Sequence, residues 1–181
     1  MKFSSTAIEG VFIIDLDPIA DHRGSFARLW SESDFAEAGV AADWVQCNVG
    51  HSIEEGTIRG LHYQRDASAE AKLVWCGSGG LFDVAVDLRQ GSPTRLKWVG
   101  VELTSVNRRA LLLPPGTAHG YQTLAPATDL WYLTSRPYDA VAATGARWND
   151  PAIGIEWPQA PGPMSDQDLN WPLVEVETEE S

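Results

Sequence analysis

Short apolar runs, rich in Val, Leu and Trp and separated by Gly, Pro, Asn and Asp, recur along almost the whole chain. They are GVFIIDL (10–16), SFARLW (25–30), DWVQCNVGHS (43–52), KLVWCG (72–77), LFDVAVDL (81–88), KWVGVEL (97–103), ALLLPPG (110–116) and DLWYLTS (129–135). Each run has the length of a strand, and GSGG and RQGSPT are good turn sequences between them. This spacing predicts an all-β sandwich or barrel.

One segment breaks this pattern and predicts a short helix, SESDFAEAG (31–39). Ser31 can cap its N-terminus, Glu32 and Asp34 favour its first turn, and Gly39 can end it. The 181 residues contain no internal repeat and no interdomain linker, so we expect one domain over 1–181. Residues 160–181 form a C-terminal extension, and its acidic end, VEVETEES, is expected to fray.

The charge balance narrows the class of protein. The chain has 13 Lys and Arg against 25 Asp and Glu, a formal net charge of −12, which argues against nucleic acid as a partner. No apolar run approaches the roughly 20 residues that cross a bilayer, and the first residues lack the pattern of a signal peptide. Cys47 and Cys76 form no C-x-x-C motif, and we expect both to be buried, reduced thiols of a cytoplasmic protein.

A histidine interrupts one of the strand-like runs, GTIRGLHYQ (56–64). Residues two apart in a strand share a face, so His62 lies with Gly60 and Gln64, while Leu61 and Tyr63 point the other way. Taken alone, such a histidine is well explained as a core side chain satisfied by one hydrogen bond. Other strands must supply further polar groups if His62 belongs to a site.

Several other strand-like runs do carry one or two ionisable groups among apolar neighbours. With His62, these groups are Lys72, Asp83, Asp87 and Tyr132. A jelly roll with a polar interior would gather them into one pocket. Alternatives remain open: Lys72 could guard a sheet edge, and Asp83 could be either a partner of Lys72 or a turn-side carboxylate. Asp87 and Arg89 are expected to form a salt bridge at a strand end.

A second histidine follows the turn in LLLPPGTAHGYQ. The P-x-G-x-x-H pattern ending at His119 resembles the second signature of the cupin superfamily. The first signature of metal-binding cupins has an H-x-H pair, but here the sequence reads His62-Tyr63-Gln64. Two histidines without a placed carboxylate fall short of the three or four ligands of a divalent site, so no metal is expected.

The ordered set of motifs resembles the dTDP-4-dehydrorhamnose 3,5-epimerase family. It comprises DHRGSF, RGLHYQ, KLVWCGSGGLFDVAVDLRQGSPT, KW, LLLPPGTAHGY, WYLTSRPY and NDPAIGIEWP, and it extends from about Gly10 to Asp168. The resemblance implies a cupin-like jelly roll, a double-stranded β-helix with short peripheral helices. It also implies a homodimer that exchanges strands and an epimerase of nucleotide-linked 4-keto-6-deoxyhexoses that uses no metal or redox cofactor.

The resemblance assigns four catalytic roles. It makes His62 the base, oriented by Asp168 in a motif that here reads Ser165-Asp166-Gln167-Asp168. Tyr132 matches the general acid, and Lys72 matches the cation beside the enolate oxygen. The residues that match substrate-binding positions are Arg59 and His119 around the sugar and diphosphate, Arg23, Phe26, Gln46 and Asn48 at the nucleotide end, and Tyr138 near the base.

Three features depart from the family pattern, and all concern the nucleotide or diphosphate end. Arg28 stands where an acidic residue is usual, Gln167 replaces a lysine, and the loop 139–145 lacks an acidic residue before its glycine. We count Arg28 and Gln167 among the substrate-binding candidates and hypothesise a changed nucleotide or sugar preference. Two other functions stay open: a non-catalytic jelly roll that binds sugar nucleotides, and a 3,4-ketoisomerase of the same superfamily.

Overall fold

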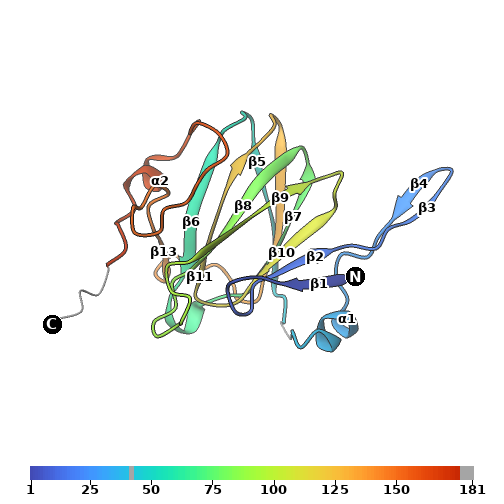
Figure 1. The fold of residues 1–181 in the computed structure, drawn as a ribbon, viewed down its shortest axis with the longest axis horizontal. Helices are drawn as coiled ribbons and strands as arrows, with labels where there is room; N and C mark the ends of the chain where they lie inside the picture. Colours follow the sequence, from blue (N-terminus) through green and yellow to red (C-terminus); the bar gives the residue numbers. More distant parts are fainter. Residues whose placement is uncertain (41–42, 176–181) are drawn as a thin grey trace.

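The computed structural model describes residues 1–40 and 43–175, which form two antiparallel sheets that face each other (Figure 1). The first sheet has the order β1-β2-β10-β7-β12-β5. Its strands are β1 (Lys2–Ser5), β2 (Phe12–Asp15), β5 (Gln46–Ser52), β7 (Lys72–Ser78), β10 (Arg109–Leu113) and β12 (Thr128–Thr134). The second sheet has the order β13-β6-β11-β8-β9. Its strands are β6 (Ile58–Gln64), β8 (Gly80–Asp87), β9 (Trp98–Thr104), β11 (Thr117–Thr123) and β13 (Ala143–Gly145).

This arrangement confirms the predicted all-β, cupin-like jelly roll with short peripheral helices. Neighbouring strands within each sheet are mostly distant in sequence, because the chain passes back and forth between the two sheets. The helical elements are α1 (Glu32–Glu37), α2 (Asp166–Asn170) and the 3₁₀ turn η1 (Asp66–Ser68). None of the helices in the described ranges is long and apolar enough to cross a membrane.

Three apolar clusters hold the layers together. The central cluster lies between the sheets and includes Val74, Leu103 and Leu111. A second cluster lies on the outer face of the second sheet, where the segment from Ala146 to Val174 covers Leu61 and its neighbours. The third lies on the outer face of the first sheet under α1. The C-terminal segment is therefore part of the folded unit and is fixed against β6.

The predicted helix forms where the sequence places it. The Ser31 side chain accepts a hydrogen bond from the Asp34 backbone amide, and Gly39 follows the helix with a φ of +74°. The predicted Arg89–Asp87 salt bridge also forms, at 2.8 Å. The run SFARLW is a strand only as far as Phe26, and most of the predicted acidic tail lies outside the described residues.

The expectation that both cysteines are buried is wrong for one of them. Cys76 lies in the central cluster, but Cys47 is exposed. Residues alternate along β5, so Cys47 points away from the interior that its neighbours Gln46 and Asn48 line.

A hairpin made of β3 (Ile19–Asp21) and β4 (Gly24–Phe26) projects from the body of the molecule (Figure 1). All six residues of its two strands are exposed, including Ile19 and Phe26. Arg23, in its turn, forms an ion pair with Asp21. The hairpin thus displays apolar and cationic side chains to solvent, away from the two packed sheets.

Two strands of the second sheet approach unusually closely at Gly60. This residue has a φ of +126°, and a Cβ there would lie 2.6 Å from Cα of Gly120 on β11. Only glycine accommodates both the conformation and the approach. The same pairing of β6 with β11 places His62 opposite His119.

Candidate active site

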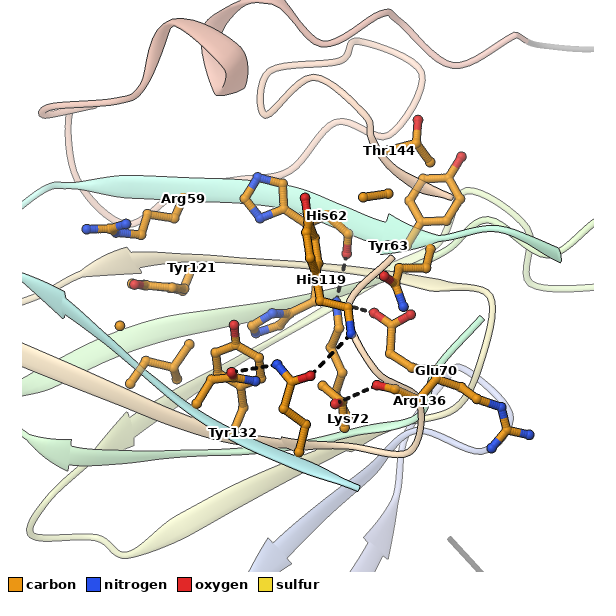
Figure 2. Close-up of a pocket in the computed structure, with 18 of the residues that line it drawn as sticks. Arg59, His62, Tyr63, Glu70, Lys72, His119, Tyr121, Tyr132, Arg136 and Thr144 are labelled. Carbon is orange, nitrogen blue, oxygen red and sulfur yellow. Dashed lines mark hydrogen bonds and ion pairs between the residues drawn. The ribbon is translucent and has the colours of Figure 1, made fainter. Parts of the chain in front are cut away.

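A pocket of about 310 Å³ opens between the two sheets (Figure 2). Nine of the residues singled out from the sequence line it: Gln46, Asn48, Arg59, His62, Lys72, His119, Tyr132, Tyr138 and Gln167. Leu61 lies in the outer cluster, as the alternation along the strand predicts, whereas Tyr63 both packs against that cluster and lines the pocket. His62 is therefore a pocket residue rather than a satisfied core histidine.

His62 is joined to the C-terminal helix. Its Nε2 lies 2.5 Å from Oδ1 of Asp168. Ser165 caps α2 by accepting a hydrogen bond from the Asp168 backbone amide at 3.1 Å, which fixes the position of the carboxylate. The Asp168 side chain is 6% exposed, whereas that of His62 is 44% exposed and accessible from the pocket. The pair has the arrangement of a base and its orienting carboxylate.

Trp171 completes this pair from the other side. Its Nε1 donates to the same Oδ1 of Asp168 at 3.2 Å, and its ring meets that of His62 edge-on with centroids 6.2 Å apart. Burial raises the pKa of Asp168, but the hydrogen bonds from His62, Ser165 and Trp171 outweigh it and hold that pKa below its usual value. A Cβ at Gly145 would lie 2.4 Å from the Trp171 ring, so glycine makes room for this contact.

Lys72 reaches across the interior from the first sheet to the second. Its Nζ donates to the backbone carbonyl of His62 at 3.1 Å and pairs with Glu70 at 3.0 Å. The lysine lies on β7, which is flanked by β10 and β12, so the edge-guard interpretation is wrong. With the Lys72 and Glu70 side chains 9% and 5% exposed, this is a buried cation beside the candidate base.

Tyr132 faces the pocket from the first sheet, while His62 faces it from the second (Figure 2). Burial raises the pKa of the Tyr132 phenol, and the charge of Glu70 raises it further, against the opposing effect of Arg59. The phenol therefore stays protonated at neutral pH. A phenol that can donate a proton thus lies on one wall of the pocket, and an imidazole that can accept a proton lies on the other.

His119 is buried and hydrogen bonded to Asp83, with Nε2 lying 2.9 and 3.1 Å from the two carboxylate oxygens. Burial raises the pKa of the Asp83 carboxyl, although His119 opposes this. The sequence left Asp83 open between a partner of Lys72 and a turn-side carboxylate. Asp83 lies inside β8, so the turn-side interpretation is wrong. Its hydrogen-bond partner is His119, and Lys72 acts on it through its charge alone, which lowers the pKa of the carboxyl.

The other polar groups of the pocket are held in place by hydrogen bonds to residues near them. Arg59 donates to the Ser52 hydroxyl at 3.2 Å and to the His51 carbonyl at 2.8 Å. Gln46 donates to Asn48 at 2.8 Å. Gln46 also accepts from the Tyr138 backbone amide at 3.2 Å, beside an exposed Tyr138 ring at the rim.

Three predicted substrate-binding residues lie elsewhere. Arg23, Phe26 and Arg28, on or just after the projecting hairpin, are not among the described residues that line this pocket. The pocket of a single chain therefore lacks Arg23 and Phe26, two of the four groups that the resemblance assigns to the nucleotide end, whereas Gln46 and Asn48 line it.

Comparison with known proteins decides the family. A model of the family described as dTDP-4-dehydrorhamnose 3,5-epimerase matches residues 5–175. The chain belongs to the dTDP-4-dehydrorhamnose 3,5-epimerase family. A relative of that name from Sinorhizobium fredii is 44% identical over 159 residues, which are 88% of this chain and 82% of its own.

Solved structures agree with this membership. The dTDP-4-dehydrorhamnose 3,5-epimerase of Bacillus anthracis, with TDP and PPi bound, superposes with a TM-score of 0.93 at 38% identity, covering 96% of this chain and 99% of that one. ChmJ from Streptomyces bikiniensis, a 3'-monoepimerase solved as a double mutant in complex with dTDP, superposes with a TM-score of 0.87 at 31% identity, covering 93% of this chain and 85% of that one. The jelly roll described above is thus shared within the family.

The sequence did not single out several residues that line the pocket, among them Glu70, Tyr121, Arg136 and Trp171. Two of them had a usable signal. Glu70 lies two positions before Lys72, which places it on the same face of an extended chain, and Trp171 lies one helical turn after Asp168. No group of three His, Cys, Asp or Glu side chains among the described residues is arranged to hold a metal ion.

Proposed function

We propose that this chain inverts C3, C5 or both in a nucleotide-linked 4-keto-6-deoxyhexose, of the type that converts dTDP-4-dehydro-6-deoxyglucose to dTDP-4-dehydrorhamnose. One observation carries the proposal: the His62–Asp168 pair and the protonated Tyr132 face one pocket from opposite sheets, with the Lys72 ammonium reaching between them. Membership of the epimerase family supports the same conclusion.

The chemistry needs a base and an acid on opposite faces of the sugar ring. The 4-keto group acidifies the hydrogens on C3 and C5. The ring nitrogen of His62 that does not contact Asp168 takes one of these protons, and the electron pair of the C–H bond moves to the ketone oxygen to form an enolate. Lys72 stabilises the enolate oxygen, and Tyr132 gives its proton to the opposite face of the carbon. Imidazolium and phenolate then exchange protons with solvent and return to their starting states.

Asp168 assists without reacting. An ionised carboxylate bonded to one imidazole nitrogen selects the tautomer whose other nitrogen accepts a proton, and it stabilises the imidazolium that forms. The structure of ChmJ offers independent support for the base and acid. Its double mutant replaces a histidine and a tyrosine whose separation in that chain equals the separation of His62 and Tyr132 here.

We further propose that the enzyme works as a homodimer with exchanged strands. Arg23, Phe26 and Arg28 lie outside the pocket of their own chain, and the hairpin that presents Phe26 projects outward (Figure 1). The outer side of β5 and β12 also displays an exposed apolar surface, the β5 patch, formed by Val45, Cys47, Val49 and Trp131. A second copy that covers this patch and contributes its hairpin would complete the nucleotide end.

The nucleotide is proposed to be dTDP, as in the solved relatives that hold TDP or dTDP. The departure at Gln167 lies in the pocket, whereas that at Arg28 lies outside it. Rates with CDP, GDP and UDP sugars compared with dTDP would test whether these departures change the preference. A cytoplasmic location is proposed as well, because both cysteines are free thiols.

The test of function is proton exchange in D₂O. We expect wild type to exchange the C3 hydrogen, the C5 hydrogen or both of dTDP-4-keto-6-deoxyglucose, followed by proton NMR. His62→Ala should abolish exchange. His51→Ala is the matched control, because His51 forms a comparable 2.6 Å pair with Asp129 outside the pocket. A folded dimer without exchange at either carbon would contradict the proposal and favour a sugar-binding module, while a product with a moved ketone would indicate a ketoisomerase.

A further inference from the structure

Glu70 is a buried carboxylate for which the roles above give no task. It lies between η1 and β7, its side chain is 5% exposed, and it lines the pocket beside Lys72 and Tyr132 (Figure 2). One carboxylate oxygen, Oε1, lies 3.0 Å from Nζ of Lys72. The other, Oε2, is buried without a hydrogen-bond partner among the described residues.

This arrangement is costly for the fold. A buried ion pair loses the hydration of both charges, and a carboxylate with one unsatisfied oxygen recovers only part of that loss. Packed apolar side chains in place of both Glu70 and Lys72 would stabilise the protein at least as well. A costly charged group beside the candidate reacting groups is therefore better explained by function than by stability.

The geometry around Lys72 shows what Glu70 can do. An ammonium group has three N–H donors. One is directed to Oε1 of Glu70 and another to the His62 carbonyl at 3.1 Å. With two donors engaged on known acceptors, rotation of the ammonium is fixed and its third N–H is left for the pocket.

We propose that Glu70 is a positioning residue of the epimerase: it anchors the Lys72 ammonium so that its remaining N–H is aimed at the enolate oxygen of the bound sugar. This inference rests on the proposed function and deepens it. The lysine alone, on a flexible four-carbon chain, would sample many orientations. Anchored between Glu70 and the His62 backbone, it is preorganised for the charge that develops when His62 removes a proton.

Glu70 also faces Tyr132, so its charge affects the pKa of the Tyr132 phenol. A residue with a purely structural role would not change that pKa, which makes it a useful readout. Its charge raises the pKa of the Tyr132 phenol, while Arg59 lowers it. The other cationic groups that line the same pocket are Lys72 and Arg136. The remaining titratable groups there are His62, His119, Tyr63, Tyr121 and Tyr138. Substitution of Glu70 leaves these side chains present and removes a negative charge beside the phenol, so the phenol should lose its proton at lower pH.

Three variants separate the anchoring of Lys72 from the effect of the negative charge of Glu70. Glu70→Ala removes both, Glu70→Gln keeps an oxygen for Lys72 but removes the charge, and Glu70→Asp keeps the charge on a shorter side chain. Asp87→Asn is the matched control, because Asp87 is an equally buried carboxylate paired with Arg89 and lies outside the pocket. Exchange rates in D₂O are measured against substrate concentration and pH, after circular dichroism has confirmed folding.

We expect Glu70→Ala to lower kcat by about 10- to 100-fold with KM within about threefold, because the lost interaction acts in the transition state. Glu70→Gln should lose less kcat, and the alkaline limb of its kcat profile should move to lower pH. Glu70→Asp should keep that limb close to the wild-type position. Unchanged kcat in Glu70→Ala, or an alkaline limb in Glu70→Gln that matches Asp87→Asn, would overturn the proposed role of Glu70 and leave the proposed function standing. Wild type without exchange at either carbon would overturn the proposed function as well.

Discussion

Nε2 of His62 and Oδ1 of Asp168 lie 2.5 Å apart, although 106 positions separate the two residues in the chain. His62 belongs to β6, which lies between β13 and β11 in the second sheet, whereas Asp168 belongs to a helix in the segment that covers the outer face of that sheet. The candidate base thus gains its orienting partner only when the C-terminal segment has docked. Docking of this segment therefore completes the His62–Asp168 pair.

Replacing the carboxylate of this pair should slow the reaction with little effect on binding. Asp168→Asn keeps the size of the side chain but removes the charge that stabilises the imidazolium. We expect kcat to fall by roughly 10²- to 10⁴-fold while KM for the nucleotide sugar stays within a few fold. Deuterium exchange under single-turnover conditions measures this directly. A loss of less than threefold would show that His62 does not act through Asp168.

Removing the indole N–H beside this carboxylate should change the pH at which the carboxylate takes up a proton. The pKa of Asp168 is depressed, so its ionised form persists to low pH and is lost as pH falls through that value. Trp171→Phe removes one of the donors that depress the pKa, so the Asp168 carboxyl should become protonated at higher pH than in wild type. Carbon NMR of the labelled carboxyl groups during an acid titration measures this. Trp157→Phe is the matched control, because its indole N–H bonds the Trp148 carbonyl away from the site. Coincident titrations of Asp168 in the two variants would contradict the role given to Trp171.

Local patterns predicted most of the longer strands, the Ser31 cap and the face on which His62 lies, because each depends on a few neighbouring residues. Motif resemblance then supplied Asp168, which no local rule connects with His62. The partners Glu70 and Trp171 were missed for a physical reason. Their importance depends on which atoms of Lys72 and Asp168 remain unsatisfied, and that is decided by packing between distant segments. Asp83 shows the same limit, because its true partner, His119, lies on another strand.

A stability prediction concerns the strand end at Asp87. Burial raises the pKa of this carboxyl, but hydrogen bonds from Arg89, Ser92 and Thr94 outweigh it and hold the pKa well below its usual value. Asp87→Asn should lower the free energy of unfolding by about 2–4 kcal/mol, because charged hydrogen bonds are lost in a buried place. In wild type this contribution is complete above about pH 4, where an unfolded aspartate is ionised, and it is lost as pH falls through the folded value.

Urea unfolding at neutral and acidic pH checks this prediction. Asp21→Asn is the matched control, because Asp21 pairs with Arg23 on the exposed hairpin, where solvent screens the interaction. The difference between the two variants should be large at neutral pH and should shrink in acid. Equal stabilities at neutral pH would contradict the account of Asp87.

The exposed thiol of Cys47 reports on the proposed dimer. Cys47 lies in the β5 patch beside Val49, whose neighbour across the strands is Trp131. If a second copy covers this patch, Cys47 should react with a thiol reagent more slowly as protein concentration rises, because the dimer shields it. Cys76 gives no competing signal, because it is buried and burial raises the pKa of its thiol to about 11.

A charge in the patch should abolish this protection and reduce substrate affinity together. Val49→Asp places a carboxylate where the copies would meet, so we expect a monomer whose Cys47 labelling no longer depends on concentration. Because the partner's hairpin would then be absent, KM for the nucleotide sugar should rise by about tenfold or more, with less effect on kcat. Val49→Ala keeps an apolar side chain and should behave like wild type. Light scattering gives the mass of each variant, and a dimeric wild type with concentration-independent labelling would place the interface elsewhere than the β5 patch.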